Sequence, residues 1–215
     1  MEIFWYGHSC FRLTERGLSS VVVDPYDHRV VGYFPQKIKA DIVAISHDAP
    51  GHNYTNATKG ARHFITGPGE YEIGGVFITA VQTDGIRRKK LDLPRNTLYL
   101  FDYDGLTVAH LGDLKQVPTQ SELDALGAVN IVLLPIGGGA GLNAAKAAEI
   151  VSQIEPNVII PMHYHTEDSS LELDTLDKFI KEMGLQPIEP LPSLKMTKSG
   201  LPTESKVVVL NYQTG

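Results

Sequence analysis

The chain of 215 residues has a single cysteine, Cys10, and no long apolar run. One thiol cannot form an internal disulfide, so the fold must be stabilised by its core. No apolar stretch approaches the roughly 18 to 20 residues that a membrane-spanning helix requires. The start MEIFWYGHSC shows neither the basic nor the apolar part of a secretory signal. These features predict a cytoplasmic protein without a membrane partner.

Basic residues are fewer than acidic ones, with 19 Lys and Arg against 25 Asp and Glu, and the net charge is −6. Because no long run of one sign occurs, the sequence lacks the electrostatic signature of a polyanion-binding protein. We therefore expect no nucleic-acid partner. Repeats and low-complexity linkers are absent too, and 42% of the residues are hydrophobic. This composition predicts one globular domain over residues 1–215.

The first half of the chain predicts short strands, because Val, Ile, Phe and Tyr are concentrated in segments separated by Gly, Pro and Asp. Asp104-Gly105 predicts a hairpin turn between the last two of these segments. The predicted strands span residues 2–6, 10–13, 20–23, 41–45, 63–66, 76–81, 97–102 and 106–110.

Three helices are predicted in the second half, each from a polar N-cap and, in two of them, a glutamate that completes a capping box. The first spans about 120–126, the second ends before Pro156, and the third ends at Gly184. Their predicted N-caps are, in order, Thr119, Asn143 and Ser169.

The strand segments IVLLPI and NVIIP are apolar at nearly every position. Both faces of such strands must be covered, which calls for helices packed outside a sheet. The β-rich first half needs a partner sheet of its own. Two facing mixed sheets with helices outside, a four-layer α/β sandwich, satisfy both requirements.

Residues that commonly bind metals are concentrated at the ends of predicted strands. Loops at one rim of a sheet can bring such side chains together, and imidazole with carboxylate suits zinc and similar ions. Each of these residues could instead hydrogen-bond a local turn. The concentrated residues are His8, His47, His52, His110, Asp113, His163 and His165.

Three other kinds of site are less well supported. The glycine run at 137–141 could bind phosphate at a helix start, but Leu142 stands where the fingerprint requires its third glycine. Glu70 and Glu72 could serve in acid–base chemistry, although their spacing places them on one face of a strand. No nucleophile elbow is present, and Cys10 lies within an apparent strand.

The order of motifs resembles the metallo-β-lactamase superfamily, in particular its small, stand-alone Zn-dependent hydrolases. The similarity covers nearly the whole chain and implies the αβ/βα sandwich, in agreement with the two-sheet expectation. The motifs that carry it are YGHSCF, DIVAISH, GPGEYEIGGVFIT, FDYDGLTVAHLGDL, LLPIGGG and VIIPMHYHT.

In that superfamily two metals are held by a His-x-His-x-Asp-His motif, a further His, a bridging Asp and a final His. Here Ala49 stands where the second His is expected, and Gly51 stands where the Asp is expected. The further His is missing as well, and Asp84 lies in the stretch where it would occur. The resemblance leaves four metal ligands, which are His47, His52, Asp113 and His163.

Two-metal chemistry is disfavoured because the first metal position keeps only His47 and a shared Asp113. Asp84, Glu70 or His165 would have to substitute for the lost ligands. The second position keeps His52, Asp113 and His163, and three protein ligands with a water form a recognised catalytic zinc arrangement. We expect one zinc ion, with manganese or no metal as alternatives. Asp113, His8 and His110 are the expected catalytic or ligand-orienting residues.

These considerations leave two functions. The first is a hydrolase in which one metal activates water for attack on an ester, amide or phosphoester of an unknown small molecule. The second is a non-catalytic binding or scaffold protein that has kept the fold and lost its metals. A homodimer is the default assembly for a chain of this kind.

Overall fold

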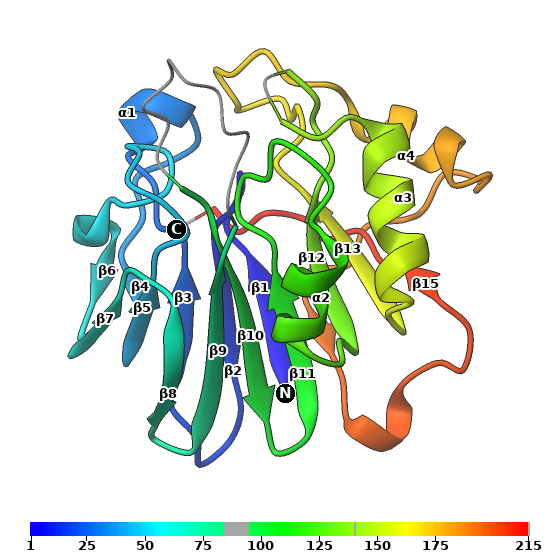
Figure 1. Cartoon of the computed structure of the whole chain (residues 1–215). Coiled ribbons are helices and arrows are strands. Elements are labelled where there is room, and N and C mark those ends of the chain that lie inside the picture. Colours follow the sequence, from blue (N-terminus) through cyan, green and yellow to red (C-terminus); the bar gives the residue numbers. More distant parts are fainter. Residues whose placement is uncertain (84–94, 140, 215) are drawn as a thin grey trace.

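The computed structural model describes residues 1–83, 95–139 and 141–214, and its strands form two large sheets and a short ribbon. In Figure 1 the helices α2, α3 and α4 lie together on one outer side, and α1 lies apart from them. This mixed α/β arrangement confirms the predicted fold class. The chain is therefore organised around two sheets that share one apolar interior.

The first sheet is mixed, with the strand order β14-β1-β2-β3-β5-β7. Strands β1, β2 and β3 pair antiparallel, whereas β3, β5 and β7 run parallel. Because β3 and β5 are parallel, the loops that follow them leave the sheet at the same edge. The bounds are β1 Glu2–Trp5, β2 Phe11–Thr14, β3 Val21–Val23, β5 Ile42–Ala44, β7 His63–Ile65 and β14 Leu194–Lys195.

The second sheet is also mixed, with the order β15-β13-β12-β11-β10-β9-β8. Strands β8 to β11 form antiparallel hairpins, and β11, β12, β13 and β15 run parallel. The Asp104-Gly105 turn between β10 and β11 is confirmed. The bounds are β8 Gly69–Ile73, β9 Val76–Gln82, β10 Thr97–Tyr103, β11 Leu106–His110, β12 Ile131–Pro135, β13 Val158–Met162 and β15 Lys206–Val207.

Burial follows the sequence pattern. Every residue of β12 and β13 is buried, as expected for strands covered on both faces, whereas β1 alternates between half-buried and buried positions. The Tyr99 hydroxyl of β10 lies 2.8 Å from the carbonyl oxygen of Ile45 and 3.1 Å from that of Ile65. Tyr99 thereby links the two sheets close to the loop that follows β5.

The helices are short, and two of the three predicted starts are confirmed. Thr119 and Glu122 form the complete capping box, and Asn143 accepts a hydrogen bond from the Lys146 amide. The remaining short elements are the ribbon strands β4 Ile38–Lys39 and β6 Thr58–Lys59 and the 3₁₀ turns Thr55–Ala57 and Lys198–Gly200. The α-helices are α1 His28–Val31, α2 Gln120–Leu126, α3 Ala144–Ile154 and α4 Leu176–Glu182.

The third predicted start, at Ser169, is wrong, because α4 begins only after Thr175. The Ser169 hydroxyl accepts instead from the Leu171 amide, and the Ser170 amide donates to the carbonyl of Val31 in α1. Contacts with α1 therefore hold this segment in an extended connection.

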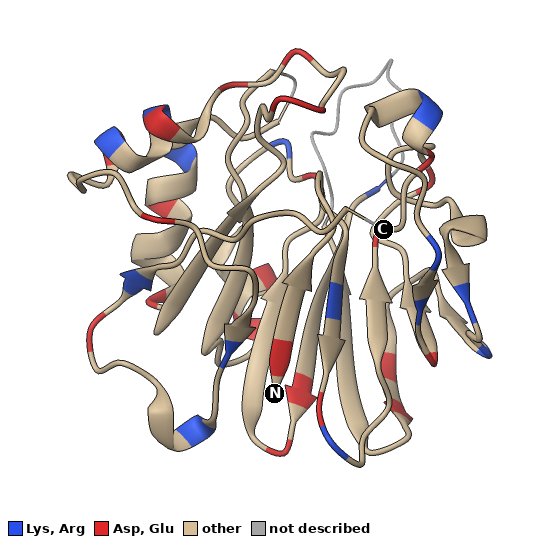
Figure 2. Ribbon diagram, turned by 180° about the vertical axis from the view of Figure 1, so that it is seen from behind, with Lys and Arg blue, Asp and Glu red and all other residues tan. Residues whose placement is uncertain are grey.

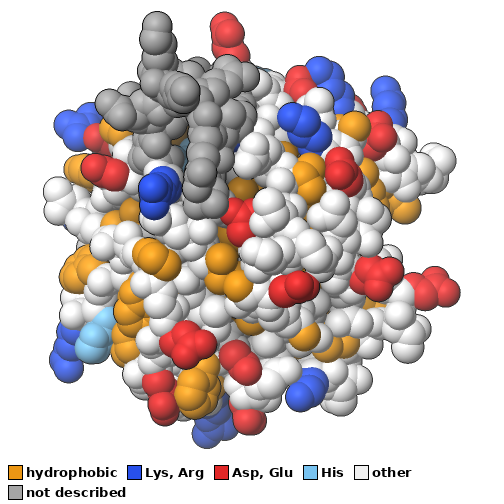
Figure 3. All heavy atoms as spheres, in the orientation of Figure 1, with side chains coloured by type: hydrophobic (Ala, Val, Ile, Leu, Met, Phe, Trp, Pro, Cys, Tyr) orange, Lys and Arg blue, Asp and Glu red, His pale blue; other side chains and the backbone are white. Residues whose placement is uncertain are grey.

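Charged side chains of both signs are interspersed over the ribbon in Figure 2. On the face shown in Figure 3, hydrophobic side chains form small groups separated by polar ones. No helix in the described ranges is both long enough and apolar enough to cross a bilayer. The polar residues that the sequence singles out lie close to the ends of the strands.

Candidate metal centre

Five potential metal ligands converge from four separate connections. His8 comes from the β1–β2 turn, Asp113 follows β11 and His163 follows β13, while His47 and His52 belong to the loop after β5. The donor atoms form two overlapping groups, each with all members within 4.8 Å of one another. The groups are His8, His52 and His163, and His47, His52 and Asp113.

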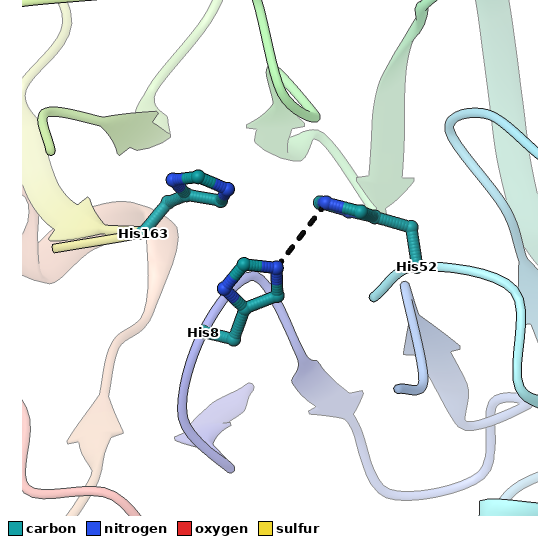
Figure 4. A group of neighbouring side chains, drawn as sticks. All are labelled: His8, His52 and His163. Atoms are coloured by element: carbon teal, nitrogen blue, oxygen red, sulfur yellow. Dashed lines mark hydrogen bonds between the residues drawn. The ribbon is translucent and has the colours of Figure 1, made fainter. Parts of the chain in front are cut away.

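The first group consists of three buried imidazoles, and Figure 4 shows their rings gathered around a common space. The Nε2 atoms of His8 and His52 are 3.2 Å apart. In a tetrahedral zinc site with Zn–N bonds of about 2.0–2.1 Å, ligand nitrogens lie roughly 3.3–3.4 Å apart. The donor types and their separation therefore fit a zinc ion.

Asp24, at the end of β3, orients His52. Its Oδ2 lies 2.9 Å from His52 Nδ1, and its two oxygens also accept from the Ser46 amide and hydroxyl, each at 2.7 Å. Burial acts to raise the pKa of Asp24, but its interactions with His52 lower the pKa to about 2. The ionised carboxylate fixes the proton of His52 on Nδ1, so Nε2 presents its lone pair to the cluster.

His8 is almost completely buried, with 2% of its surface exposed. Burial is the main cause that lowers the pKa of His8 well below its usual value, and the neighbouring His163 and His52 lower it further. The ring is therefore neutral. Since His52 Nε2 acts as the acceptor, His8 Nε2 donates across the 3.2 Å contact. His8 Nδ1 is buried without a hydrogen-bond partner in the described part of the chain.

Asp113 connects the two donor groups and is also paired with a lysine. Its Oδ1 lies 3.7 Å from His163 Nε2, and the Lys115 ammonium contacts Oδ2. Burial acts to raise the pKa of Asp113, but His163, His52 and Lys115 outweigh it and lower the pKa. Its own amide donates to Asn96 Oδ1 at 3.0 Å. The carboxylate is thus held ionised among the rings.

His47 and His163 are also neutral at pH 7. Burial and the neighbouring His52 lower the pKa of His47 to about 4, and its Nδ1 lies 2.9 Å from the Ser46 hydroxyl. Burial lowers the pKa of His163 to about 4, although the Asp113 carboxylate acts in the opposite direction. Neutral imidazole is the form that binds metals.

Three residues of the site have left-handed backbone conformations. The φ angles are 51° at His8, 48° at Asp24 and 53° at His163. Such a conformation costs a non-glycine residue about 1–3 kcal/mol and persists only where the surrounding structure enforces it. The His8 and His163 side chains face the common space, and the Asp24 carboxylate lies behind the His52 ring, which is the behaviour expected of a functional site.

His110 bonds to the backbone and not to the cluster. Its Nε2 donates to the carbonyl of Ser9 at 2.8 Å, and its Nδ1 accepts from the Gly112 amide at 3.1 Å. Both ring nitrogens are committed to the backbone, so His110 offers neither a ligand atom nor an exchangeable proton here. It fixes the turn that precedes Asp113 and ties that turn to the residue after His8.

Two of the suggested substitute ligands, His165 and Glu70, belong to neither donor group. His165 and Glu70 are exposed, the former beside the segment before α4 and the latter on β8. Asp84 lies outside the described residues. Asp24 is the functional residue that the sequence analysis missed; the available signal was a carboxylate directly after the apolar strand VVV.

The glycine run has a packing role. A Cβ on Gly137 would lie 2.0 Å from the carbonyl oxygen of His163, and one on Gly141 would lie 3.2 Å from Asp113 Oδ1. At the start of α3, the Lys146 amide is already capped by Asn143. The glycines let two loops approach closely, which does not favour the phosphate-binding alternative.

A family model described as "Beta-lactamase superfamily domain" matches residues 2–163, which include all five converging residues. The chain belongs to the β-lactamase superfamily. A UPF0173 protein of Pyrococcus furiosus is 28% identical to it, and the alignment covers 88% of this chain and 98% of the relative. A UPF0173 metal-dependent hydrolase of Thermoplasma acidophilum is also 28% identical, over 78% of this chain and 85% of that one.

Solved structures share the fold of this chain. A candidate Zn-dependent hydrolase from Thermotoga maritima is 31% identical, covers 97% of each chain and superposes with a TM-score of 0.78. An isothiocyanate hydrolase from gut bacteria of Delia radicum has a TM-score of 0.68, over 92% of this chain and 99% of that one, but is only 14% identical. The second similarity concerns the fold alone. The superfamily identification rests on the family model, and the donor cluster lies within the residues that this model matches.

Proposed function

We propose that the protein is a hydrolase that works with a single metal ion, zinc in the first instance, held by His52, Asp113, His163 and one further imidazole. The observation that carries this proposal is the convergence of two overlapping donor groups, one of three imidazoles and one of two imidazoles with a carboxylate, each with its donor atoms within 4.8 Å of one another. Ala49 and Gly51 remove two ligands of the family motif, which favours one ion over two. Manganese is the second candidate metal.

The chemistry follows from the residues around the ion. When bound, zinc lowers the pKa of a coordinated water and polarises the bond to be hydrolysed. Asp24 keeps the lone pair of His52 directed at the ion. The Asp113 carboxylate is placed to accept a proton from the attacking water. The Lys115 ammonium, 34% exposed beside Asp113, can hold a negatively charged oxygen of the substrate. Esters, amides and phosphoesters are the substrate classes that this chemistry serves.

One observation favours the second function, a metal-free binding or scaffold protein. The Lys115 ammonium already neutralises Asp113. Because the Lys115 ammonium already interacts with this carboxylate, a metal ion bound there would gain less electrostatic attraction from Asp113. The two functions differ in metal content, which can be measured directly.

The test is to load the purified protein with zinc or manganese, remove the excess and count metal by mass spectrometry. We expect about one zinc per chain, with less than half of it retained in an Asp113→Asn/His163→Gln variant. The matched control is His63→Gln, on an exposed position of β7. The loaded protein should hydrolyse a nitrophenyl ester or phosphodiester, and the double variant should not. Absence of bound metal would establish the scaffold alternative instead.

A further inference from the structure

We propose that His8 is a ligand of this metal and takes the place of the aspartate that the family motif carries at position 51. The inference rests on the proposed function, because it concerns the same ion. It identifies the further imidazole as His8 and assigns a role to a residue from outside the His-x-His-x-Asp-His motif. The argument begins with the space around Gly51.

The His8 ring lies where a side chain at position 51 would point. A Cβ built on Gly51 would be 3.1 Å from His8 Nε2 and 3.3 Å from Val31 Cγ1. The first contact is tight even for a methyl group, so an aspartate at position 51 would require the imidazole to shift by a few tenths of an ångström. His8 therefore lies directly beside the position at which the family motif carries its aspartate.

The ring is also directed at the other ligands. Its Nε2 faces His52 Nε2 at 3.2 Å, and its centroid lies 4.3 Å from that of His163 (Figure 4). Two imidazoles that share one proton satisfy only one nitrogen lone pair, whereas a divalent cation accepts a lone pair from each. A cation between the rings would thus accept a lone pair from both, where the present contact uses the lone pair of only one.

The position of His8 is rigidly held. Its carbonyl accepts from the Trp5 indole and from the His163 amide, both at 3.0 Å. These bonds join the β1–β2 turn directly to the loop that carries His163. A ligand fixed in this way is preorganised, so little conformational entropy is lost when it binds a metal.

The replacement changes the character of the site. Three imidazole ligands with Asp113 give a divalent ion a net charge of about +1, where the family's additional carboxylate would give about zero. Imidazole is a softer donor than carboxylate and suits zinc better than manganese. We therefore expect His8 to shift the metal preference of the site toward zinc.

The decisive experiment is a compensation test with four proteins: wild type, His8→Ala, Gly51→Asp, and the double variant His8→Ala/Gly51→Asp. Zinc affinity is measured by competition with a chromophoric chelator, and metal content by mass spectrometry. Because loss of an outer-shell partner alone costs about 10–100-fold, His8→Ala should weaken zinc binding by at least about 100-fold. The double variant should recover most of this loss and bind manganese better relative to zinc than wild type does.

Three controls make the result interpretable. His8→Gln keeps a polar side chain at this position and should also lose affinity, while circular dichroism reports whether each variant is folded. His63→Gln should leave zinc affinity unchanged. Wild-type affinity in folded His8→Ala, or a double variant no better than His8→Ala, would overturn the inference. If wild type itself binds no zinc, the proposed function fails instead, so the two failures are distinguishable.

Discussion

At the scale of single residues, the site depends on groups that do not face the metal position. Asp24 is fully buried, and its two oxygens together accept from the Ser46 amide, the Ser46 hydroxyl and the His52 ring. Such an outer-shell carboxylate sets the tautomer and basicity of the ligand that it contacts. The function of His52 is therefore inseparable from that of Asp24.

Replacing Asp24 by Asn tests this coupling. The amide keeps the shape but removes the negative charge that holds the proton on His52 Nδ1. We expect zinc affinity to fall about 10–100-fold, as is typical when an outer-shell partner is lost. Chelator competition measures the change, with Asp41→Asn as the control, because the Asp41 carboxylate accepts from the Ser20 amide and hydroxyl at the distant start of β3. Equal zinc affinities for wild type and Asp24→Asn would contradict the assignment.

Lys115 has the opposite effect on the metal. Its ammonium contacts Asp113 Oδ2, so it competes with any cation for that carboxylate. Lys115→Met should tighten zinc binding, by about tenfold if one ion pair worth roughly 1.4 kcal/mol is released. Lys178→Met, which removes an exposed pair with Asp174, is the control. Weaker zinc binding in Lys115→Met would show that the lysine supports the site.

Part of the site could be predicted from the sequence. His47, His52, Asp113 and His163 were proposed from the motif order, and the structure brings their donor atoms together. Asp24 was missed because a single carboxylate after a strand has no spacing signal. His8 lies between two strands, and His110 is the last residue of another. The sequence does not distinguish their roles, because only the backbone geometry decides where each ring points.

At the scale of elements, the glycine run positions a ligand loop. Gly137 and the His163 backbone are in such close contact that a Cβ would lie 2.0 Å from the His163 carbonyl oxygen. Gly137 also accepts from the Asp174 amide at 2.7 Å, so it links this loop to the segment before α4. The connection between β12 and α3 therefore sets the position of His163.

Gly137→Ala should displace this loop. Forced overpacking of this kind costs about 1–3 kcal/mol, and the shift of His163 should also weaken zinc binding. Denaturant unfolding and zinc titration measure the two effects. Gly67→Ala is the matched control, because a Cβ there meets nothing within 4 Å. If Gly137→Ala matched wild type in both measurements, the packing role would be refuted.

Helix starts were predictable where a cap acts locally and not where tertiary contacts decide. Thr119 and Asn143 bond to amides three residues away, so their sequence neighbourhood contains the whole interaction. Next to Ser169, the Ser170 amide donates to the carbonyl of Val31 in α1. The Ser170 hydroxyl donates to the carbonyl of Val30, which is 140 residues away in the chain. Hydrogen bonds between segments so far apart in the chain leave no signal in the local sequence, so this helix start could not be predicted from it.

At the scale of the whole molecule, the proposed metal site joins parts of both sheets. His52 follows β5 of the first sheet, and Asp113 and His163 follow β11 and β13 of the second. A ligand that bridges the two sheets stabilises the folded state, since the unfolded chain cannot present the same site. The two-sheet architecture itself was predictable, because the continuous apolar strands required cover on both faces.

Zinc should therefore raise thermal stability. At a free zinc concentration 100 times the dissociation constant, linkage gives about 2.7 kcal/mol. For a chain of this length, each kcal/mol shifts Tm by about 2–4 °C, so we expect a rise of about 5–11 °C. Differential scanning fluorimetry with and without a chelator measures it. The gain should disappear in Asp113→Asn/His163→Gln, and an equal gain in that variant would indicate zinc binding elsewhere.

The most direct measurement is anomalous scattering at the zinc absorption edge from crystals of the zinc-loaded protein. The account predicts one strong peak per chain, within coordination distance of His8, His52, Asp113 and His163, with His47 outside the coordination sphere. Two peaks, a peak that excludes His8 or no peak at this cluster would contradict it.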